Sequence, residues 1–155
     1  MKYEQQVRIE RSVPHVFDYM DDVKRESEWQ PSIQEADKDP PGPTAVGTRK
    51  RYVSEFMGRR IENTYVTTVF VPNKRVVYET TPDSVLQARA ELRFEPAGAG
   101  TRVTMGFEGK VTGPLRLVPR RLLERVYREE MESTLALLKT CLESSGLSGE
   151  PRSGE

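Results

Sequence analysis

Two segments near the middle of the chain alternate apolar and polar residues and are separated by a few positions. In SVLQARAELRFE (84–95), every second residue from Leu86 to Phe94 is apolar, and the residues between them are polar or charged. TRVTMGFEGKV (101–111) shows the same alternation. A period of two residues is typical of an antiparallel strand with one buried and one solvated face. We therefore predict a hairpin whose apolar face the rest of the chain must cover.

Gly98 and Gly100 lie between these segments, in FEPAGAGTRVTM. A phosphate-binding loop needs its glycines between a strand and a helix N-terminus, with a third glycine or Gly-Lys-Ser/Thr following. Here the chain continues as a strand. We expect both glycines to supply positive φ angles to a hairpin turn, and we expect the segment to bind no nucleotide.

The other elements are predicted from the same kinds of pattern. Strands are expected at 3–11, 48–56, 61–71 and 75–81, short helices at about 14–20 and 22–29, and an amphipathic helix at about 119–143. Both faces of 61–71 are apolar, so which of them faces inward stays open. A strand, two short helices, about six strands and one long helix indicate an α+β domain with helices on one face of an antiparallel sheet.

Length and composition restrict the function. The 155 residues suit one domain, expected over 1–143, with a disordered tail over 144–155. Lys plus Arg equals Asp plus Glu at 24 each, so no global field favours nucleic acid or membrane, and no apolar run is long enough to span a bilayer. The sequence contains one cysteine, Cys141, and one histidine, His15. We expect a cytoplasmic protein with no disulfide, no metal site and no cofactor, and a surface position for His15.

The ordered set of segments resembles a known superfamily. RSVPHVFDYMDDVKRESEWQPSI near the start, VGTR at 46–49, VPNKRVVYET at 71–80, FEPAGAGTRVTM and LALLKTCLE at 135–143 match the START-like, Bet v 1-like superfamily, in particular its bacterial polyketide cyclase/dehydratase-like (SRPBCC) branch. The resemblance covers roughly residues 3–143. It implies a helix-grip fold, in which a curved seven-stranded antiparallel sheet holds the long C-terminal helix over an apolar cavity.

The apolar faces of these elements supply a candidate ligand-binding set. Ala88 and Ala90 are small residues on the buried face of 84–95, and they leave room either for close helix packing or for a ligand. Trp29 suits a gate at the pocket mouth and, equally, a staple between helices and sheet. The predicted lining consists of Phe17, Met20, Trp29, Tyr52, Phe56, Tyr78, Leu86, Ala88, Ala90, Leu92, Met105, Phe107, Tyr127, Met131 and Thr134. Any one of these residues could pack a solid core, whereas the set favours a cavity.

A catalytic group is harder to assign. Glu130 lies beside the apolar stripe of the long helix and is the best candidate for an inward carboxylate, although a solvated position is favoured. If it is buried, desolvation would raise its pKa and suit it to acid–base chemistry. Glu79 and Glu108 fall on the outer faces of their strands. Without a second partner in the pocket, binding is favoured over catalysis.

Three functions remain open in order of preference. The first is binding, without catalysis, of a small hydrophobic molecule such as a lipid, an isoprenoid or a polyketide-like compound. The second is a polyketide aromatase/cyclase or dehydratase that uses the same cavity, and the third is a protein-interaction domain with a vestigial pocket. The arginines of PLRLVPRRLLERVYR could touch an anionic membrane transiently, but an ion-paired, solvated helix face is favoured. We expect a monomer or a homodimer.

Overall fold

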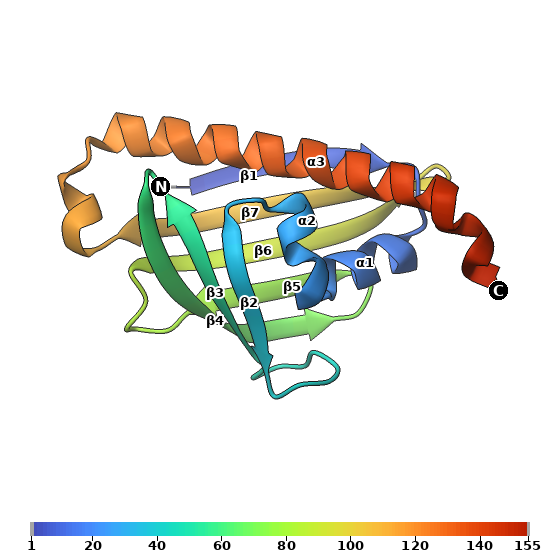
Figure 1. Ribbon diagram of the computed structural model, residues 1–155, viewed down its shortest axis with the longest axis horizontal. Coiled ribbons are helices and arrows are strands. Elements are labelled where there is room, and N and C mark those ends of the chain that lie inside the picture. Colours follow the sequence, from blue (N-terminus) through green and yellow to red (C-terminus); the bar gives the residue numbers. More distant parts are fainter. Residues whose placement is uncertain (1, 155) are drawn as a thin grey trace.

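Seven antiparallel strands form one curved sheet, and a long helix follows them in the chain (Figure 1). The computed structural model describes residues 2–154, and it describes their side chains except at 114 and 145–154. The strands are β1 (Lys2–Ile9), β2 (Ile33–Asp39), β3 (Arg49–Phe56), β4 (Arg59–Val71), β5 (Arg75–Thr80), β6 (Leu86–Ala97) and β7 (Gly100–Val111). The helices are α1 (Val13–Asp21), α2 (Glu26–Trp29) and α3 (Arg120–Gly154), with 3-10 turns η1 (Val23–Arg25) and η2 (Gly113–Leu117). From residue 145 on, the expected tail lies outside the residues whose side chains are described.

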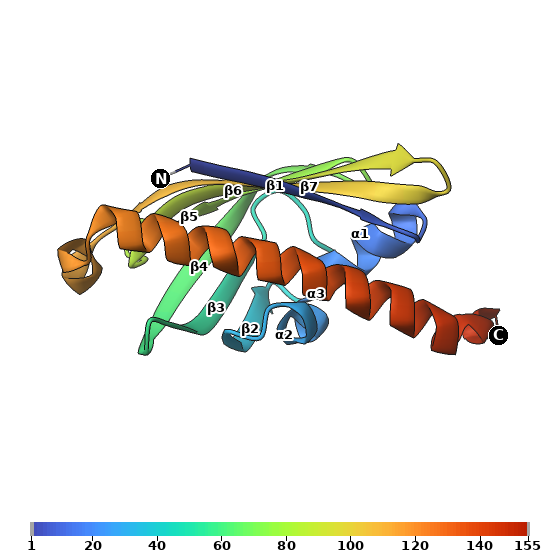
Figure 2. The ribbon, with the colours of Figure 1, turned by 90° about the horizontal axis from the view of Figure 1, so that it is seen from above.

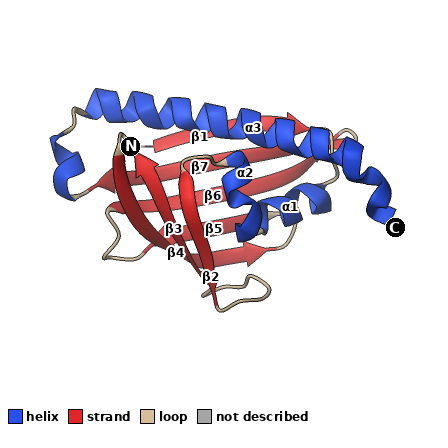
Figure 3. Cartoon of the chain, in the orientation of Figure 1, coloured by secondary structure: helices blue, strands red, loops and turns tan. Residues whose placement is uncertain are grey.

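The strand order is β1-β7-β6-β5-β4-β3-β2, so the first two strands of the chain lie at opposite edges of the sheet. The short helices α1 and α2 make the connection between these edges (Figure 3). Viewed from above, α3 lies between the half of the sheet that contains β1 and β7 and the half that contains β2 and β3 (Figure 2). The sheet therefore curves around the helix. The predicted α+β, helix-grip architecture is confirmed.

β4 shows why the periodicity of 61–71 could not orient the strand. Its odd-numbered residues from Ile61 to Tyr65 face inward. A register shift opposite β5, between Thr67 and Val69, then changes the alternation. Beyond this bulge the even-numbered Phe70 faces inward and packs against Phe17, with ring centroids 5.7 Å apart. Because the inward face changes from odd to even positions, both sets of residues are apolar.

Two groups of buried apolar side chains form the core, and α3 contributes to both. A large cluster contains Ile9, Val16, Phe17, Tyr19, Met20, Trp29, Val76, Leu92, Phe94, Val103, Leu135, Leu138 and Leu142. A small cluster contains Phe56, Ile61, Leu115 and Leu123. Along α3, Leu123 belongs to the small cluster and Leu135 to the large one. Between them, Tyr127, Glu130, Met131 and Thr134 face the space that separates the two clusters.

The turn between β6 and β7 corrects one expectation. Gly98 has a φ of 64° and supplies the predicted left-handed conformation, but Gly100 is not among the residues with positive φ. Gly100 is needed for a different reason, because a Cβ atom there would collide with the carbonyl oxygen of Ile9 on β1. The segment continues directly into β7 and no helix follows. The turn therefore lacks the geometry of a phosphate-binding loop.

Candidate functional site

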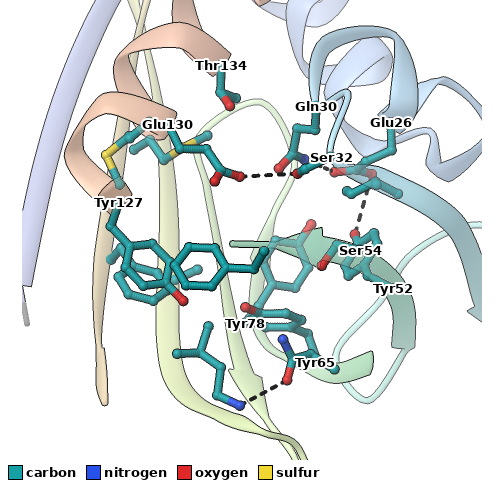
Figure 4. Close-up of a pocket in the computed structure, with 18 of the residues that line it drawn as sticks. Glu26, Gln30, Ser32, Tyr52, Ser54, Tyr65, Tyr78, Tyr127, Glu130 and Thr134 are labelled. Atoms are coloured by element: carbon teal, nitrogen blue, oxygen red, sulfur yellow. Dashed lines mark hydrogen bonds between the residues drawn. The ribbon is translucent and has the colours of Figure 1, made fainter. Parts of the chain in front are cut away.

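A cavity of about 220 Å³ lies between the inner face of the sheet and α3, in the space between the large and small clusters. Its walls come from β2 to β7, from α2 and the turn that follows it, and from the middle of α3 (Figure 4). The lining residues are Glu26, Trp29, Gln30, Ser32, Ile33, Tyr52, Ser54, Glu55, Phe56, Ile61, Asn63, Tyr65, Tyr78, Leu86, Ala90, Leu92, Met105, Gly106, Phe107, Tyr127, Glu130, Met131 and Thr134.

Most of the residues predicted as lining from the sequence border this cavity, and Phe17, Met20 and Ala88 do not. Phe17 and Met20 are buried in the large cluster, because α1 packs beside the cavity rather than over it. Ala88 lies opposite Gly109 on β7, where a Cβ atom at position 109 would come within 2.9 Å of the Ala88 Cβ. This close approach of the two strands requires glycine at position 109, and Ala88 lies outside the lining. Trp29 both borders the cavity and packs in the large cluster.

Aromatic rings form two opposite parts of the lining. On one side, the Tyr127 ring from α3 stacks with Phe56 at 4.7 Å and with Phe107 at 5.4 Å between centroids. On the other, Tyr52 and Tyr65 meet edge to face at 5.9 Å, and Tyr65 and Tyr78 do so at 6.5 Å. Rings packed in these pairs make a large part of the lining aromatic, which suits an apolar molecule.

Glu26 is the most deeply buried carboxyl group in the lining, with 5% of its surface exposed. Gln30 Nε2 donates a hydrogen bond to one carboxyl oxygen at 2.7 Å, and the Tyr52 hydroxyl donates to the other at 3.4 Å. Burial raises the pKa of Glu26 to about 7, although the charge of Lys50 and these two hydrogen bonds act in the opposite direction. Near neutral pH this carboxyl group can therefore either give or take a proton.

Glu130 also borders the cavity, from α3, and it is half-buried rather than fully solvated. The Ser32 hydroxyl donates a hydrogen bond to its carboxylate at 3.1 Å. Burial raises the pKa of Glu130, and the hydrogen bond from Ser32 offsets part of this rise. Two carboxyl groups, Glu26 and Glu130, thus share one cavity (Figure 4).

Several hydroxyl groups of the lining have no partner among the described residues. The hydroxyls of Tyr65 and Tyr127 make no hydrogen bond there. Burial raises the pKa of Tyr65 to about 12 and raises that of Tyr127 as well, so both phenols stay protonated at neutral pH. Hydroxyls that lack protein partners and face a cavity are available to a bound molecule.

Lys50 on β3 contacts Tyr78 from outside the cavity. Its side chain is 1% exposed and is not part of the lining. Its ammonium group donates to the carbonyl and carboxylate oxygens of Asp21, both at 3.2 Å, and to the Tyr78 hydroxyl at 3.1 Å. A buried lysine is stable only when it is paired in this way.

The inward positions of Lys50 and Glu26 were not predicted from the sequence, although the sequence pattern around each residue indicates such a position. Lys50 falls on the same face of its strand as Tyr52, and so it is a charged residue at an inward position. Glu26 precedes Trp29 by three residues and therefore shares its helical face. Tyr65 lies on the strand whose orientation was open. Among the described residues, no group of three or more His, Cys, Asp or Glu side chains could hold a metal ion.

The basic segment before and within α3 is a solvent-exposed surface. Arg116, Arg120 and Arg125 are exposed, and the latter two pair with glutamates four residues along the helix, at 2.9 and 3.3 Å. These i, i+4 pairs were predicted. Of the described helices, none combines the length and the apolar character needed to cross a bilayer.

A long helix gripped by a curved seven-stranded antiparallel sheet defines the helix-grip class of domains. The family described as polyketide cyclase / dehydrase and lipid transport matches residues 1–143, and the chain belongs to this family. A comparison with curated proteins found no match.

Solved structures share the fold at low sequence identity. The protein TTHA0849 from Thermus thermophilus has a TM-score of 0.80 and 18% identity, over 94% of this chain and 99% of that one. A START superfamily protein from Mycobacterium smegmatis has a TM-score of 0.76 and 16% identity, over 92% and 97% of the two chains. The Zhui aromatase/cyclase from Streptomyces sp. R1128 has a TM-score of 0.71 and 16% identity, over 92% and 93%. At these identities the likeness concerns the fold.

Proposed function

We propose that the chain binds a small, flat, largely apolar molecule that carries oxygen groups, in the cavity between the sheet and α3. The observation that carries the proposal is the lining itself, in which stacked aromatic rings surround hydroxyl groups that have no partner among the described residues. The membership of the chain in a family of cyclases and lipid carriers supports a hydrophobic ligand in general terms.

The size of the cavity restricts the ligand class. Pockets for drug-sized molecules usually have volumes of roughly 300–1,000 Å³. At about 220 Å³, this cavity is smaller and suits a molecule of two or three fused rings better than a two-chain lipid. Among the ligand types expected from the sequence, an aromatic or polyketide-like compound therefore fits best.

Substitution of Ala90 tests the proposal. Ala90 borders the cavity and lies between Tyr78 on β5 and Phe107 on β7, so the ring of Ala90→Phe would occupy ligand space. We expect the variant to fold and to lose at least ten-fold in affinity for a fused-ring ketone such as 2-acetylnaphthalene. Trp29 is the single tryptophan and borders the cavity, so its fluorescence reports binding.

Ala136→Phe is the matched control, because Ala136 is exposed on α3 and lies outside the lining. It should bind the ketone as the wild type does. Unchanged affinity in Ala90→Phe would place any ligand elsewhere, and absence of binding to the wild type across fused-ring ketones and phenols would refute the proposal.

A second candidate, cyclisation of a polyketide-type chain, is favoured by Glu26 and Glu130, which unlike Glu55, the third carboxyl group of the lining, are not solvent-exposed. Glu26 or Glu130, as carboxylate, would remove a proton from the carbon between two carbonyl groups. That carbon would attack a further carbonyl carbon and form a carbon–carbon bond, and the carboxylic acid would return the proton to the new alkoxide. Incubation of the wild type with a linear poly-β-ketone thioester tests this function, since the rate of ring formation should exceed that of Ala90→Phe. Equal rates for the two proteins would refute cyclisation and leave ligand binding as the proposed function.

A further inference from the structure

Lys50 is a cation enclosed by the protein, and all three of its N–H groups are used. Two of them donate to Asp21 and the third donates to the Tyr78 hydroxyl. The lysine therefore cannot itself contact a molecule in the cavity without losing one of these bonds. Its side chain is fixed in this position, because the Asp21 carboxylate forms an ion pair with the same nitrogen atom at 3.2 Å.

The hydrogen bond from Lys50 determines what the Tyr78 hydroxyl can do. Burial tends to lower the pKa of Lys50, but Tyr78, Asp21 and Glu26 outweigh this effect and raise it, so the ammonium group stays charged and donates. Burial raises the pKa of Tyr78, so the phenol keeps its proton. The phenolic oxygen accepts from Lys50, and the hydroxyl hydrogen has no acceptor among the described residues. Tyr78 borders the cavity, where a ligand could accept this hydrogen.

The neighbouring tyrosines differ from Tyr78 in this respect. The Tyr52 hydroxyl already donates its hydrogen to Glu26. The Tyr65 hydroxyl has no hydrogen bond to a described residue and no cation behind it. A hydroxyl that accepts a hydrogen bond from a cation becomes a stronger donor, because hydrogen bonds in a chain polarise one another. Of the three, Tyr78 combines a free hydrogen with such polarisation.

We infer that Tyr78, polarised by Lys50, donates a hydrogen bond to an acceptor oxygen of the bound molecule, and that the cavity thereby selects ketones and phenolates over hydrocarbons of the same shape. The inference rests on the proposed function and specifies the ligand class of the same cavity. Lys50 acts as a positioning residue, since it reaches the ligand through Tyr78. In a cyclising reaction the same donor would stabilise the oxygen that gains negative charge.

A matched pair of probes tests the inference. 2-Acetylnaphthalene and 2-isopropenylnaphthalene have nearly the same shape, because a methylene group replaces the carbonyl oxygen, but only the ketone has an acceptor oxygen. We expect the wild type to bind the ketone roughly ten-fold more tightly than the hydrocarbon, which is the effect of one strong hydrogen bond. Tyr78→Phe should abolish this preference and leave the affinity for the hydrocarbon unchanged. Tyr3→Phe is the matched control, because Tyr3 lies outside the lining and its hydroxyl has no partner among the described residues, so this variant should keep the preference.

The carbonyl stretching frequency of the bound ketone, labelled with carbon-13, gives a second readout in the wild type itself. Donation from Tyr78 lowers this frequency below its value in hexane, so the inference stays testable even if the variants do not fold. In Tyr78→Phe the frequency should return toward the hexane value, and in Lys50→Met it should lie between the two, because the hydroxyl remains and the cation is gone.

The outcomes separate the inference from the proposed function. Equal binding of the two probes by the wild type, or a preference that survives in Tyr78→Phe, overturns the inference alone. So does a wild-type carbonyl frequency equal to that in hexane. If neither probe binds the wild type, the proposed function fails and the inference fails with it.

Discussion

At the scale of single residues, Glu26 has the environment least like that of a surface carboxylate. It is buried beside Lys50 and Tyr52, and its pKa is about 7 instead of the ordinary 4.5. Between these two pH values the folded chain holds a proton that the unfolded chain has lost. Protonation of Glu26 thus contributes stability that is fully present below pH 4.5 and is lost as the pH rises through about 7.

Glu26→Gln should remove this pH dependence. Relative to the variant, the wild type should lose up to roughly 3 kcal/mol of unfolding free energy between pH 4.5 and pH 7.5, since each unit of pKa shift corresponds to about 1.4 kcal/mol. Urea unfolding at several pH values measures the difference. Glu108→Gln, an exposed position on the outer face, should follow the wild type. Parallel pH curves for wild type and Glu26→Gln would show that Glu26 titrates normally.

At the scale of the elements, the hairpin of β6 and β7 lies between β1 and β5 in the sheet, and its two glycines have different roles. Gly98 needs a positive φ, and a Cβ there would meet only the flexible end of Arg8. Gly100 needs the space next to the Ile9 carbonyl group, which belongs to the backbone of a paired strand and cannot rotate away.

Gly100→Ala should therefore destabilise the protein more than Gly98→Ala. For Gly98→Ala we expect a loss of about 1–2 kcal/mol, the cost of a left-handed conformation for alanine. For Gly100→Ala we expect a larger loss, with amide hydrogen exchange increased along β1, because β1 must move away from β7. Chemical denaturation gives the free energies. Equal losses for the two variants would mean that β1 accommodates the added methyl group without cost.

The elements also show what could be predicted from the sequence. The periods of two and of 3.6 residues identified α3 and every strand except β2, because one face of each is in contact with the core. The face of β4 could not be predicted, since a bulge exchanges odd and even positions within the strand. Phe17 is apolar like the cavity lining, and only the packing of α1 in the large cluster separates it from the cavity. Ion pairs between residues far apart in the sequence, such as Lys50 with Asp21, could not be predicted, because no local sequence pattern marks them.

At the scale of the whole molecule, the cavity is an interruption between two packed clusters, and it reduces stability. Thr134 on α3 is buried, borders the cavity and makes no hydrogen bond through its hydroxyl to a described residue. A larger apolar residue at this position would join the large and small clusters. Natural binding sites commonly reduce stability in this way.

Thr134→Leu should raise the unfolding free energy by about 1 kcal/mol and weaken ligand binding at the same time, because the new side chain fills ligand space. Thermal unfolding and the Trp29 fluorescence titration measure the two effects. Ser133→Leu, exposed on the same helix, controls for helix propensity and should change neither. A less stable Thr134→Leu would indicate that the surrounding side chains already occupy this volume.

Along α3, the residues that face the cavity lie between a segment packed in the small cluster and a segment packed in the large cluster. The helix is therefore held in place at both ends of the cavity. A ligand slightly too large for the cavity could enter only if α3 bends or if one end of it separates from its cluster. The free energy lost through this misfit would then come from the packing of both clusters and not from a single contact. For the proposed binding, discrimination by ligand size should therefore depend on the packing of both clusters, and substitutions that loosen either cluster should broaden the range of molecules bound.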